Sequence, residues 1–461
     1  MPGVYKENVV IEKPVRIISW GKVMAAIARP LPPEVKIIIR PQDAARPAIK
    51  VLANNVRLSG LVIEGGSAGI ELAGVTGAKL IENEVRGGEA GITLRGARGN
   101  LLKGNRISAS SAGIELLGGS GNKLSENSIA GSELGLRLDN AEANELAANK
   151  VGRARTGVLL RGSRGNRLVG NAISEGQSGL VLDRSGGNIL KENRLIGSPR
   201  PLELLGEAVE DWLQEIDTTN KVDGRPIYYL VGKEGLELTP AQNPGYVALV
   251  RCRSITVSGI SIGGGQTGLL LIETDGIVLR NNRLSGAAVG LKLWRTKNSL
   301  LEGNTIAGGE VGIQLRDSTG EILSRNTVTG SELGILVEGG GGHLLEGNEV
   351  SGARRGLSLL GSNGNRLEGN AVRGSKEYGL LLEGSSGNTI EGNELLGNWV
   401  GIFLQSAQAN SIVENRAGEG QYGLYLASSS GNEIARNDFS GNGRAGLGGS
   451  LEGNKVGENR T

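Results

Sequence analysis

The sequence is poor in the side chains that form disulfides, bind soft metals or build large aromatic cores. Its 461 residues include one Cys (Cys252), one His (His343) and two Met (Met1 and Met24), and aromatic residues make up only 3%. A single Cys excludes an intramolecular disulfide. Because soft metals prefer His, Cys and Met ligands, we predict no metal site and no cofactor.

Charge and hydropathy exclude three further classes of protein. Lys and Arg total 50 against 48 Asp and Glu, a net charge of +2, and the basic residues are scattered along the chain. Nucleic-acid partners require a concentrated basic surface, so we predict no nucleic-acid partner. No apolar run approaches the ~18 residues of a transmembrane helix. With 12 Pro and 38% hydrophobic residues, the chain is also not of the disordered class.

Glycine is present in excess, and it belongs to a repeat. There are 78 Gly residues, about 17% against the usual ~7%. An Asn in the phrase N-x-(I/V/L) recurs every 22 residues from Asn83 to Asn193; the series resumes at Asn282 with the same period and slips by one residue before Asn393. Asn454 follows Asn437 by 17 residues, which predicts a short final coil. The repeated positions are Asn83, Asn105, Asn127, Asn149, Asn171, Asn193, Asn282, Asn304, Asn326, Asn348, Asn370, Asn393, Asn415 and Asn437.

Two other markers keep the same period. A Gly opens the phrase G-(I/L/V)-x-L, as at Gly91, Gly113 and Gly401, and a second Asn series runs through Asn100 and Asn122. Residues 277–345 lack this second series. Between the markers, the apolar stretches are two or three residues long and alternate, which is typical of short strands.

Three short strands in each repeat predict an all-β fold. We expect a right-handed, single-stranded parallel β-helix, a solenoid of about 22 residues per coil, with coils ~4.8 Å apart. In register, each Asn amide can bond to the coils above and below it and form a ladder. A leucine-rich repeat is the alternative, but Gly and Ser fill the half of the repeat where its helix would lie.

The repeat is regular in two sections. We expect an N-terminal β-helix section at residues 1–204, an insertion at 205–246 and a C-terminal β-helix section at 247–461. Residues Ala208–Ile216 could form a short helix in the insertion. The chain reads as a strand from residue 4, with no signal peptide or capping element. We therefore expect a truncated N-terminus, with a genuine cytoplasmic start as the alternative.

Three stretches resemble the NosD-like right-handed parallel β-helix proteins, which have the pectate-lyase-like superfold. They are the opening Pro2-Gly3-Val4-Tyr5, the N-x-L-x-x-N-x-I coils, and the phrase from Ile216 to Tyr229. The resemblance implies an extracytoplasmic location (secreted, periplasmic or cell surface) and contact with glycans. The founding member of the family is linked to the maturation of a periplasmic copper site. We do not carry copper over, because this chain has so few soft ligands.

Catalysis has weak support in the sequence. By alternation, the second and fourth residues after the marker Gly point away from the core. In the fourth-position column, Glu338 and Glu383 lie two coils apart, ~9.6 Å by the strand spacing, at the far edge of the ~6.5–9.5 Å separation in inverting glycosidases. Asp139, Arg161 and Asp183 predict a surface charge ladder in the same column, and His343 is predicted to be a turn residue.

Aromatic residues give the stronger signal for a binding site. Six of the thirteen fall within residues 378–439. Phe403 and Tyr425 are 22 residues apart and should stack on adjacent coils, with Trp399 on the same face. We predict ligand binding by Trp399, Phe403, Tyr425 and Trp294; the alternative is a ladder that only stabilises the coils.

Three functions remain open at this point. The sequence favours a non-catalytic extracytoplasmic or cell-surface β-helix protein, structural or carbohydrate-binding, with a polysaccharide or glycan as partner. A polysaccharide lyase or hydrolase is the first alternative. A self-assembling surface or filament subunit, which would associate with itself, is the second.

Overall fold

The computed structural model describes residues 3–19, 36–108 and 111–461. The chain forms a parallel β-solenoid of about 19 turns with about 22 residues per coil. The predicted all-β solenoid is therefore confirmed. It divides into two compact units, Met1–Ile227 and Tyr228–Thr461. Among the described residues, no helix is both long and apolar enough to cross a membrane.

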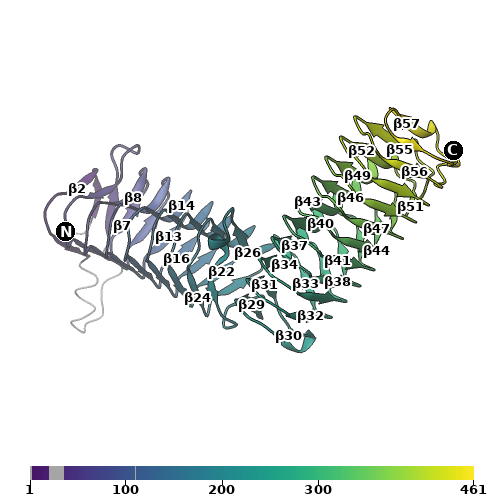
Figure 1. The fold of residues 1–461 in the computed structure, drawn as a ribbon. Helices are drawn as coiled ribbons and strands as arrows, with labels where there is room; N and C mark the ends of the chain where they lie inside the picture. The colour runs from purple at the N-terminus through teal and green to yellow at the C-terminus, as the bar shows by residue number, and fades with distance from the viewer. Residues whose placement is uncertain (1–2, 20–35, 109–110) are drawn as a thin grey trace. The chain divides into compact units, whose positions relative to one another are not determined.

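The N-terminal unit has three parallel sheets, and each coil contributes one strand to each sheet (Figure 1). The sheet with the longest strands contains β2 (Val9–Ile11), β5 (Ile49–Val51), β8 (Ala68–Ala73), β11 (Ala90–Arg95), β14 (Ala112–Leu117), β17 (Leu134–Asp139), β20 (Thr156–Arg161), β23 (Ser178–Asp183) and β26 (Arg200–Leu205). The second contains β3 (Arg16–Ile18), β6 (Arg57–Ser59), β9 (Lys79–Ile81), β12 (Leu101–Lys103), β15 (Lys123–Ser125), β18 (Glu145–Ala147), β21 (Arg167–Val169), β24 (Ile189–Lys191) and β27 (Glu215–Ile216). The third contains β1 (Gly3–Lys6), β4 (Ile37–Arg40), β7 (Val62–Glu64), β10 (Glu84–Arg86), β13 (Arg106–Ser108), β16 (Ser128–Ala130), β19 (Lys150–Gly152), β22 (Ala172–Ser174), β25 (Arg194–Ile196) and β28 (Lys221–Val222).

The C-terminal unit repeats this plan. Its long-strand sheet contains β31 (Tyr246–Val250), β34 (Thr267–Ile272), β37 (Val289–Trp294), β40 (Val311–Arg316), β43 (Leu333–Glu338), β46 (Arg355–Leu360), β49 (Tyr378–Glu383), β52 (Val400–Gln405), β55 (Tyr422–Ala427) and β57 (Ala445–Gly449). The second sheet contains β30 (Glu237–Leu238), β32 (Thr256–Ser258), β35 (Val278–Arg280), β38 (Leu300–Glu302), β41 (Ile322–Ser324), β44 (Leu344–Glu346), β47 (Arg366–Glu368), β50 (Thr389–Glu391), β53 (Ser411–Val413), β56 (Glu433–Ala435) and β58 (Lys455–Val456). The third contains β33 (Ser261–Gly263), β36 (Arg283–Ser285), β39 (Thr305–Ala307), β42 (Thr327–Thr329), β45 (Glu349–Ser351), β48 (Ala371–Arg373), β51 (Glu394–Leu396) and β54 (Arg416–Gly418).

Alternation and register build the core of each coil. In β11 and β14, Ile92 pairs with Ile114 and Leu94 with Leu116, and all four side chains are fully buried. Equivalent residues therefore stack on one another at the strand spacing and form continuous apolar columns. The apolar residues of one coil thus lie over those of the next.

The Asn ladder is confirmed as a buried hydrogen-bonded column. Asn127 is fully buried. Its backbone N–H and its amide Nδ2 both donate to Oδ1 of Asn149, at 3.1 and 2.9 Å, and Nδ2 also donates to the carbonyl of Leu102 at 3.0 Å. Each amide thus satisfies polar groups in both neighbouring coils, which water cannot reach.

The predicted short final coil is wrong. Asn437 bonds to Asn459, 22 residues later, and Asn454 continues the second series, 22 residues after Asn432. Asn437 and Asn454 therefore belong to different ladders. The 17-residue distance separates Asn437 and Asn454, which lie at two different turns of the coil, so it does not measure the length of a coil.

The insertion continues the solenoid with longer coils. Strands β27 and β28 pair in parallel with β24 and β25, and Asn193 bonds to Asn220 across 27 residues. The chain then turns back in β29 (Arg225–Val231), antiparallel to β28. The expected helix is only one 3₁₀ turn, η1 (Val209–Trp212), and a second, η2 (Pro240–Gln242), lies further on.

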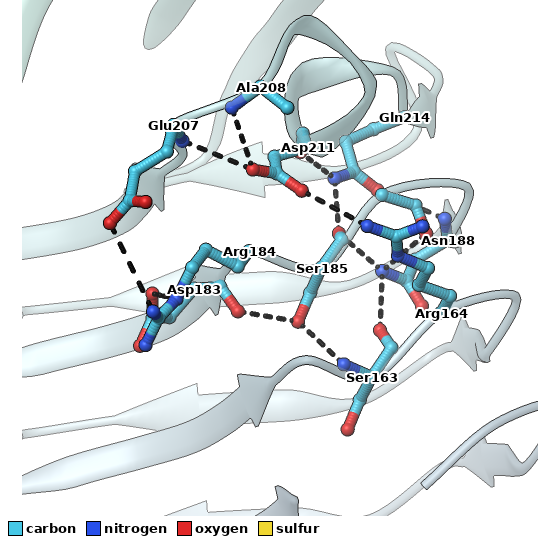
Figure 2. Close-up of polar contacts among 11 residues, drawn as sticks. Ser163, Arg164, Asp183, Arg184, Ser185, Asn188, Glu207, Ala208, Asp211 and Gln214 are labelled. Carbon is cyan, nitrogen blue, oxygen red and sulfur yellow. Dashed lines mark hydrogen bonds and ion pairs between the residues drawn. The ribbon is translucent and has the colours of Figure 1, made fainter. Parts of the chain in front are cut away.

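Figure 2 shows how the second ladder of the N-terminal unit ends. Gln214 takes the place of Asn: its Oε1 accepts from the backbone N–H of Asn188 at 3.0 Å, and its Nε2 donates to the carbonyl of Ser185 at 2.6 Å. Buried Asp211 accepts two backbone N–H groups at 3.1 Å and contacts Arg164 at 3.4 Å. Gln214 and Asp211 therefore satisfy backbone polar groups of the last coil where the 22-residue period breaks.

The predicted charge ladder on the N-terminal unit is only half right. Arg161 does contact Asp183 on the next strand, with Nε 3.2 Å from Oδ2. Asp139, however, is hydrogen-bonded by Arg137 of its own strand. Arg137 also contacts Glu115 at 3.1 Å. Asp139 is thus paired by a residue of the second-position column and not by Arg161 of its own column.

Candidate functional site

An aromatic groove lies on the outer face of the long-strand sheet of the C-terminal unit, over β49, β52 and β55. It is an open depression of about 400 Å³. Its lining residues are Lys376, Glu377, Tyr378, Trp399, Val400, Phe403, Tyr422 and Tyr425.

Strand register gathers the rings of the groove. Leu381 pairs with Phe403, and Phe403 pairs with Tyr425 on the next strand. In the column before the marker Gly, Tyr378 and Tyr422 stand on either side of Val400. The two columns are on the outer face and adjacent, so their side chains meet above the sheet.

The rings contact one another over three coils. Tyr378 stacks on Phe403 with centroids 4.7 Å apart and planes at 17°, and Phe403 meets Tyr425 at 5.8 Å. Tyr425 meets Tyr422 edge to face, at 5.2 Å and 75°. These are favourable aromatic geometries. The four side chains are half-buried, because each covers part of its neighbours, and they form the floor of the groove.

Trp399 is different because it stands at the preceding turn with half of its surface (50%) exposed. Phe439, by contrast, is fully buried under Gly423. Trp399 is thus the large exposed surface beside a hollow floored by other rings.

The turn before β49 is one residue longer than its neighbours, and this shapes the edge of the groove. The N–H of Trp399 donates to the carbonyl of Ser375 at 3.1 Å, and the N–H of Val400 donates to the carbonyl of Glu377 at 2.9 Å. These two bonds pass over the carbonyl of Lys376, whose own N–H donates to the carbonyl of Ala353 at 3.1 Å and whose side chain is exposed. The extra residue that precedes Asn393 in the sequence is therefore accommodated in this turn, and Lys376 lies beside Trp399.

Charged groups flank the rings. The guanidinium of Arg444 lies 6.0 Å from the ring centroids of both Trp399 and Tyr422, and that of Arg355 lies 5.6 Å from the ring of Tyr378. The Glu377 carboxylate accepts from Arg354 and Arg355, at 2.8 Å in each contact. These hydrogen bonds lower the pKa of Glu377 below its ordinary value, so it is an anion held between two cations.

Trp294 lies away from this groove. It is on β37, four strands before β49 in the long-strand sheet, or ~19 Å at the usual spacing. Only 7% of its surface is exposed. Its Nε1 donates to Oδ2 of Asp317 at 3.3 Å, and Arg295 lies 4.8 Å from its ring.

The two candidate catalytic carboxylates are also outside the groove. Glu338 accepts from Nε2 of Gln314 at 2.8 Å, and Leu360 separates it from Glu383 in the strand register. Neither carboxylate is among the residues that line the depression.

His343 occupies a ladder position, which the sequence pattern missed. The second series lacks Asn there because Ser299, Glu321 and His343 replace it: the N–H of Ser299 donates to Oε2 of Glu321 at 2.7 Å, and the N–H of Glu321 donates to Nδ1 of His343 at 3.1 Å. The N–H of His343 donates in turn to Oδ1 of Asn365 at 3.0 Å. Stepping back from Asn365 by 22 residues would have found both side chains.

Comparison with protein families identifies the chain. A family model described as "Periplasmic copper-binding protein (NosD)" matches residues 48–228, 217–339 and 330–447. The chain belongs to the NosD family. No curated protein matches the sequence.

Solved structures similar to this NosD family member are parallel β-helix proteins. The A-module of the Azotobacter vinelandii mannuronan C-5 epimerase AlgE4 is 14% identical over 83% of this chain and 86% of its own, with a TM-score of 0.31. The periplasmic alginate epimerase AlgG is 10% identical over 89% and 77%, with a TM-score of 0.23. A mannuronic acid specific family 6 lyase from human gut microbiota is 11% identical over 76% and 80%, with a TM-score of 0.32.

The soft donors of this NosD family member do not fit a copper site. Cys252 and His343 are buried and lie about four coils apart, ~19 Å by the strand spacing. Burial raises the pKa of the Cys252 thiol, which disfavours the thiolate that binds metals. Met1 and Met24 are outside the described residues, and within those residues no group of three His, Cys, Asp or Glu side chains is placed to hold a metal ion.

Proposed function

We propose that the protein is a non-catalytic, extracytoplasmic β-helix protein that binds carbohydrate at the aromatic groove. The observation that carries the proposal is Trp399, half exposed beside a hollow of about 400 Å³ whose floor is made of other rings. Sugar rings present apolar C–H faces, and aromatic side chains bury such surface at little cost in conformational entropy.

The shape and charge of the groove favour a saccharide over an apolar ligand. An open depression cannot enclose a ligand, so it suits one segment of an extended chain rather than a small apolar molecule. Two cations, Lys376 and Arg444, border the rings, and they can donate hydrogen bonds to hydroxyl or acidic groups of a sugar. The family description, periplasmic, supports the extracytoplasmic location.

Catalysis and copper binding have less support. The carboxylate at the groove edge, Glu377, is bound by two arginines, whereas a general acid needs a raised pKa. The family name includes copper, but the soft donors of the described residues are buried and apart. We therefore propose neither activity for this chain.

Binding of a panel of oligosaccharides, followed by Trp fluorescence and calorimetry, tests the proposal. Trp399→Ala should weaken binding at least about tenfold, the equivalent of ~1.4 kcal/mol, and should abolish the fluorescence change. Ile322→Ser is the matched control, because Ile322 is an exposed apolar side chain (40%) on β41 of another sheet.

A double variant tests the floor of the groove separately from the exposed Trp399. Phe403→Ser with Tyr425→Ser removes all three ring contacts, each worth about 0.5–1.5 kcal/mol, and should abolish binding while the β-sheet circular dichroism signal remains. If no oligosaccharide binds the unaltered protein, or if Trp399→Ala binds as tightly as it does, carbohydrate binding at this groove is wrong.

A further inference from the structure

The exposed cations of the groove lack carboxylate partners. In the described structure Lys376 and Arg444 form no ion pair, although the arginines at the start of β46 do. By contrast, Glu332 and Glu377 neutralise the adjacent Arg354 and Arg355.

Both cations are held next to Trp399 by the fold. Lys376 lies in the longer turn, where its N–H donates to the carbonyl of Ala353 at 3.1 Å, and it lines both the groove and the smaller hollow beside it. Arg444 comes from the turn before β57; its N–H donates to the carbonyl of Gln421 at 3.0 Å, and its guanidinium lies over Trp399 and Tyr422. The two cations therefore reach Trp399 from different coils.

Among the described residues, the groove has fewer unpaired carboxylates than unpaired cations near Trp399. Of the residues that line the groove, Glu377 is the acidic one, and two arginines hold it. Glu419 lines the smaller hollow together with Lys376 and Trp399. On the groove side of Trp399, the charges without an ion pair in the described part of the chain are therefore those of Lys376 and Arg444, and both are positive.

We infer that the groove selects an acidic saccharide, whose carboxylate or sulfate group binds Lys376 and Arg444 while its ring packs on Trp399. This inference rests on the proposed carbohydrate binding and adds its specificity. Guanidinium and ammonium groups form short, charge-assisted hydrogen bonds with such anions. An aromatic surface between them supplies contact with the sugar ring itself.

Oligosaccharides of equal length with different charge test the inference on the full chain. The probes are an oligogalacturonate for carboxylate, a sulfated galactan oligosaccharide for sulfate, and a cello-oligosaccharide as the neutral reference. At about 50 mM salt we expect at least one acidic probe to bind about tenfold more tightly than the neutral one. Raising the salt to about 0.5 M should remove most of this preference, because salt screens charges.

Charge-removing variants assign the preference to residues. Lys376→Gln and Arg444→Gln should each reduce the ratio of acidic to neutral affinity about three- to tenfold and leave neutral binding nearly unchanged. Arg283→Gln is the control, because Arg283 is an exposed cation on β36 of another sheet. Deletion of Lys376, which restores the 22-residue coil, should act like Lys376→Gln.

The outcomes separate the two proposals. If acidic and neutral probes bind equally and Trp399→Ala abolishes both, the acidic selectivity is wrong and carbohydrate binding stands. If the acidic preference survives in the Lys376→Gln, Arg444→Gln double variant, these cations are not its source and the inference is overturned. If no probe binds, both proposals fail.

Discussion

At the scale of single residues, the most unusual feature is a pair of titratable side chains inside a ladder of neutral amides. Glu321 and His343 are fully or almost fully buried, and each takes the position that Asn holds in the coils beyond. Oε1 of Glu321 accepts from Oγ1 of Thr296 at 2.7 Å. Burial raises the pKa of Glu321 to about 7 and lowers that of His343 to about 4.

These two pKa shifts act on stability in opposite directions. The ordinary pKa of Glu321 is 4.5, so its stabilising contribution is full below that pH and is lost as the pH rises towards 7. The ordinary pKa of His343 is 6.5, so its contribution is full above that pH and is lost as the pH falls towards 4. In the unaltered protein the two dependences offset each other between about pH 4.5 and 6.5.

Removing one member of the pair should reveal the other. In His343→Asn, the free energy of unfolding should fall as the pH rises from about 4.5 to 7, by up to about 1.4 kcal/mol per pH unit. In Glu321→Asn it should rise between about pH 4 and 6.5. Urea unfolding at several pH values measures both slopes, and slopes of the same sign would contradict this assignment.

At the scale of the element, the marker position of each coil must be Gly because there is no room for a Cβ atom. A Cβ at Gly312 would lie 2.3 Å from Cγ1 of Val328 and 2.6 Å from the carbonyl oxygen of Gly334. The same clash recurs along the column, for example at Gly113 with Ile129. The long strand and the strand of the third sheet therefore approach too closely there for any side chain.

Gly312→Ala should therefore destabilise the C-terminal unit by about 1–3 kcal/mol, the usual cost of overpacking. Gly263→Ala is the control, because a Cβ at Gly263 would meet its nearest atom only at 3.9 Å. Thermal unfolding of the two variants gives the comparison. An equal, small shift for both would mean that the strands can separate at little cost.

Sequence periodicity predicts most of this element-level structure, but not what covers an outward position. Three markers at one period are enough for the strands, the ladder and the pairing of Phe403 with Tyr425 on adjacent strands, but the predicted stacking of these two rings is wrong, because their planes are tilted by 45°. By alternation, Thr93 and Leu381 also point outward, yet each is only 1% exposed. Side chains of adjacent coils cover such positions. The alternation within one strand predicts which way a side chain points but not whether its neighbours cover it.

The same limit applies to the groove. The aromatic residues on β49, β52 and β55 follow from spacing, but the contribution of Lys376 depends on where one extra residue is absorbed in a turn. Arg444 reaches Trp399 from two coils away, and a long flexible side chain has no periodic signature. Trp294 shows the converse, because an outward aromatic position can be almost fully buried.

At the scale of the whole molecule, each coil contacts its two neighbours, so the effect of a mutation should fade with distance along the stack. Asn127→Leu leaves the backbone N–H of Asn105 and the carbonyl of Leu102 without their partners, at a cost of about 1–3 kcal/mol. Ser128→Ala, at an exposed neighbouring position, should cost less than about 0.5 kcal/mol.

Hydrogen exchange with mass spectrometry can locate that loss. Protection in Asn127→Leu should fall most in the coils that contain β12, β15 and β18 and should be unchanged near the C-terminus. A uniform loss of protection over the entire chain would show that the coils unfold together, contrary to the nearest-neighbour picture.

The ladders also have a consequence for how this gene can change over evolutionary time. Because the bonds of each ladder Asn to other coils reach only the coils next to its own, an in-frame duplication or deletion of one whole coil leaves the remaining ladder contacts with equivalent partners. Recombination between neighbouring repeats can therefore lengthen or shorten the protein in steps of one coil. The aromatic groove cannot be altered so freely, since its rings and cations come from successive, non-equivalent coils.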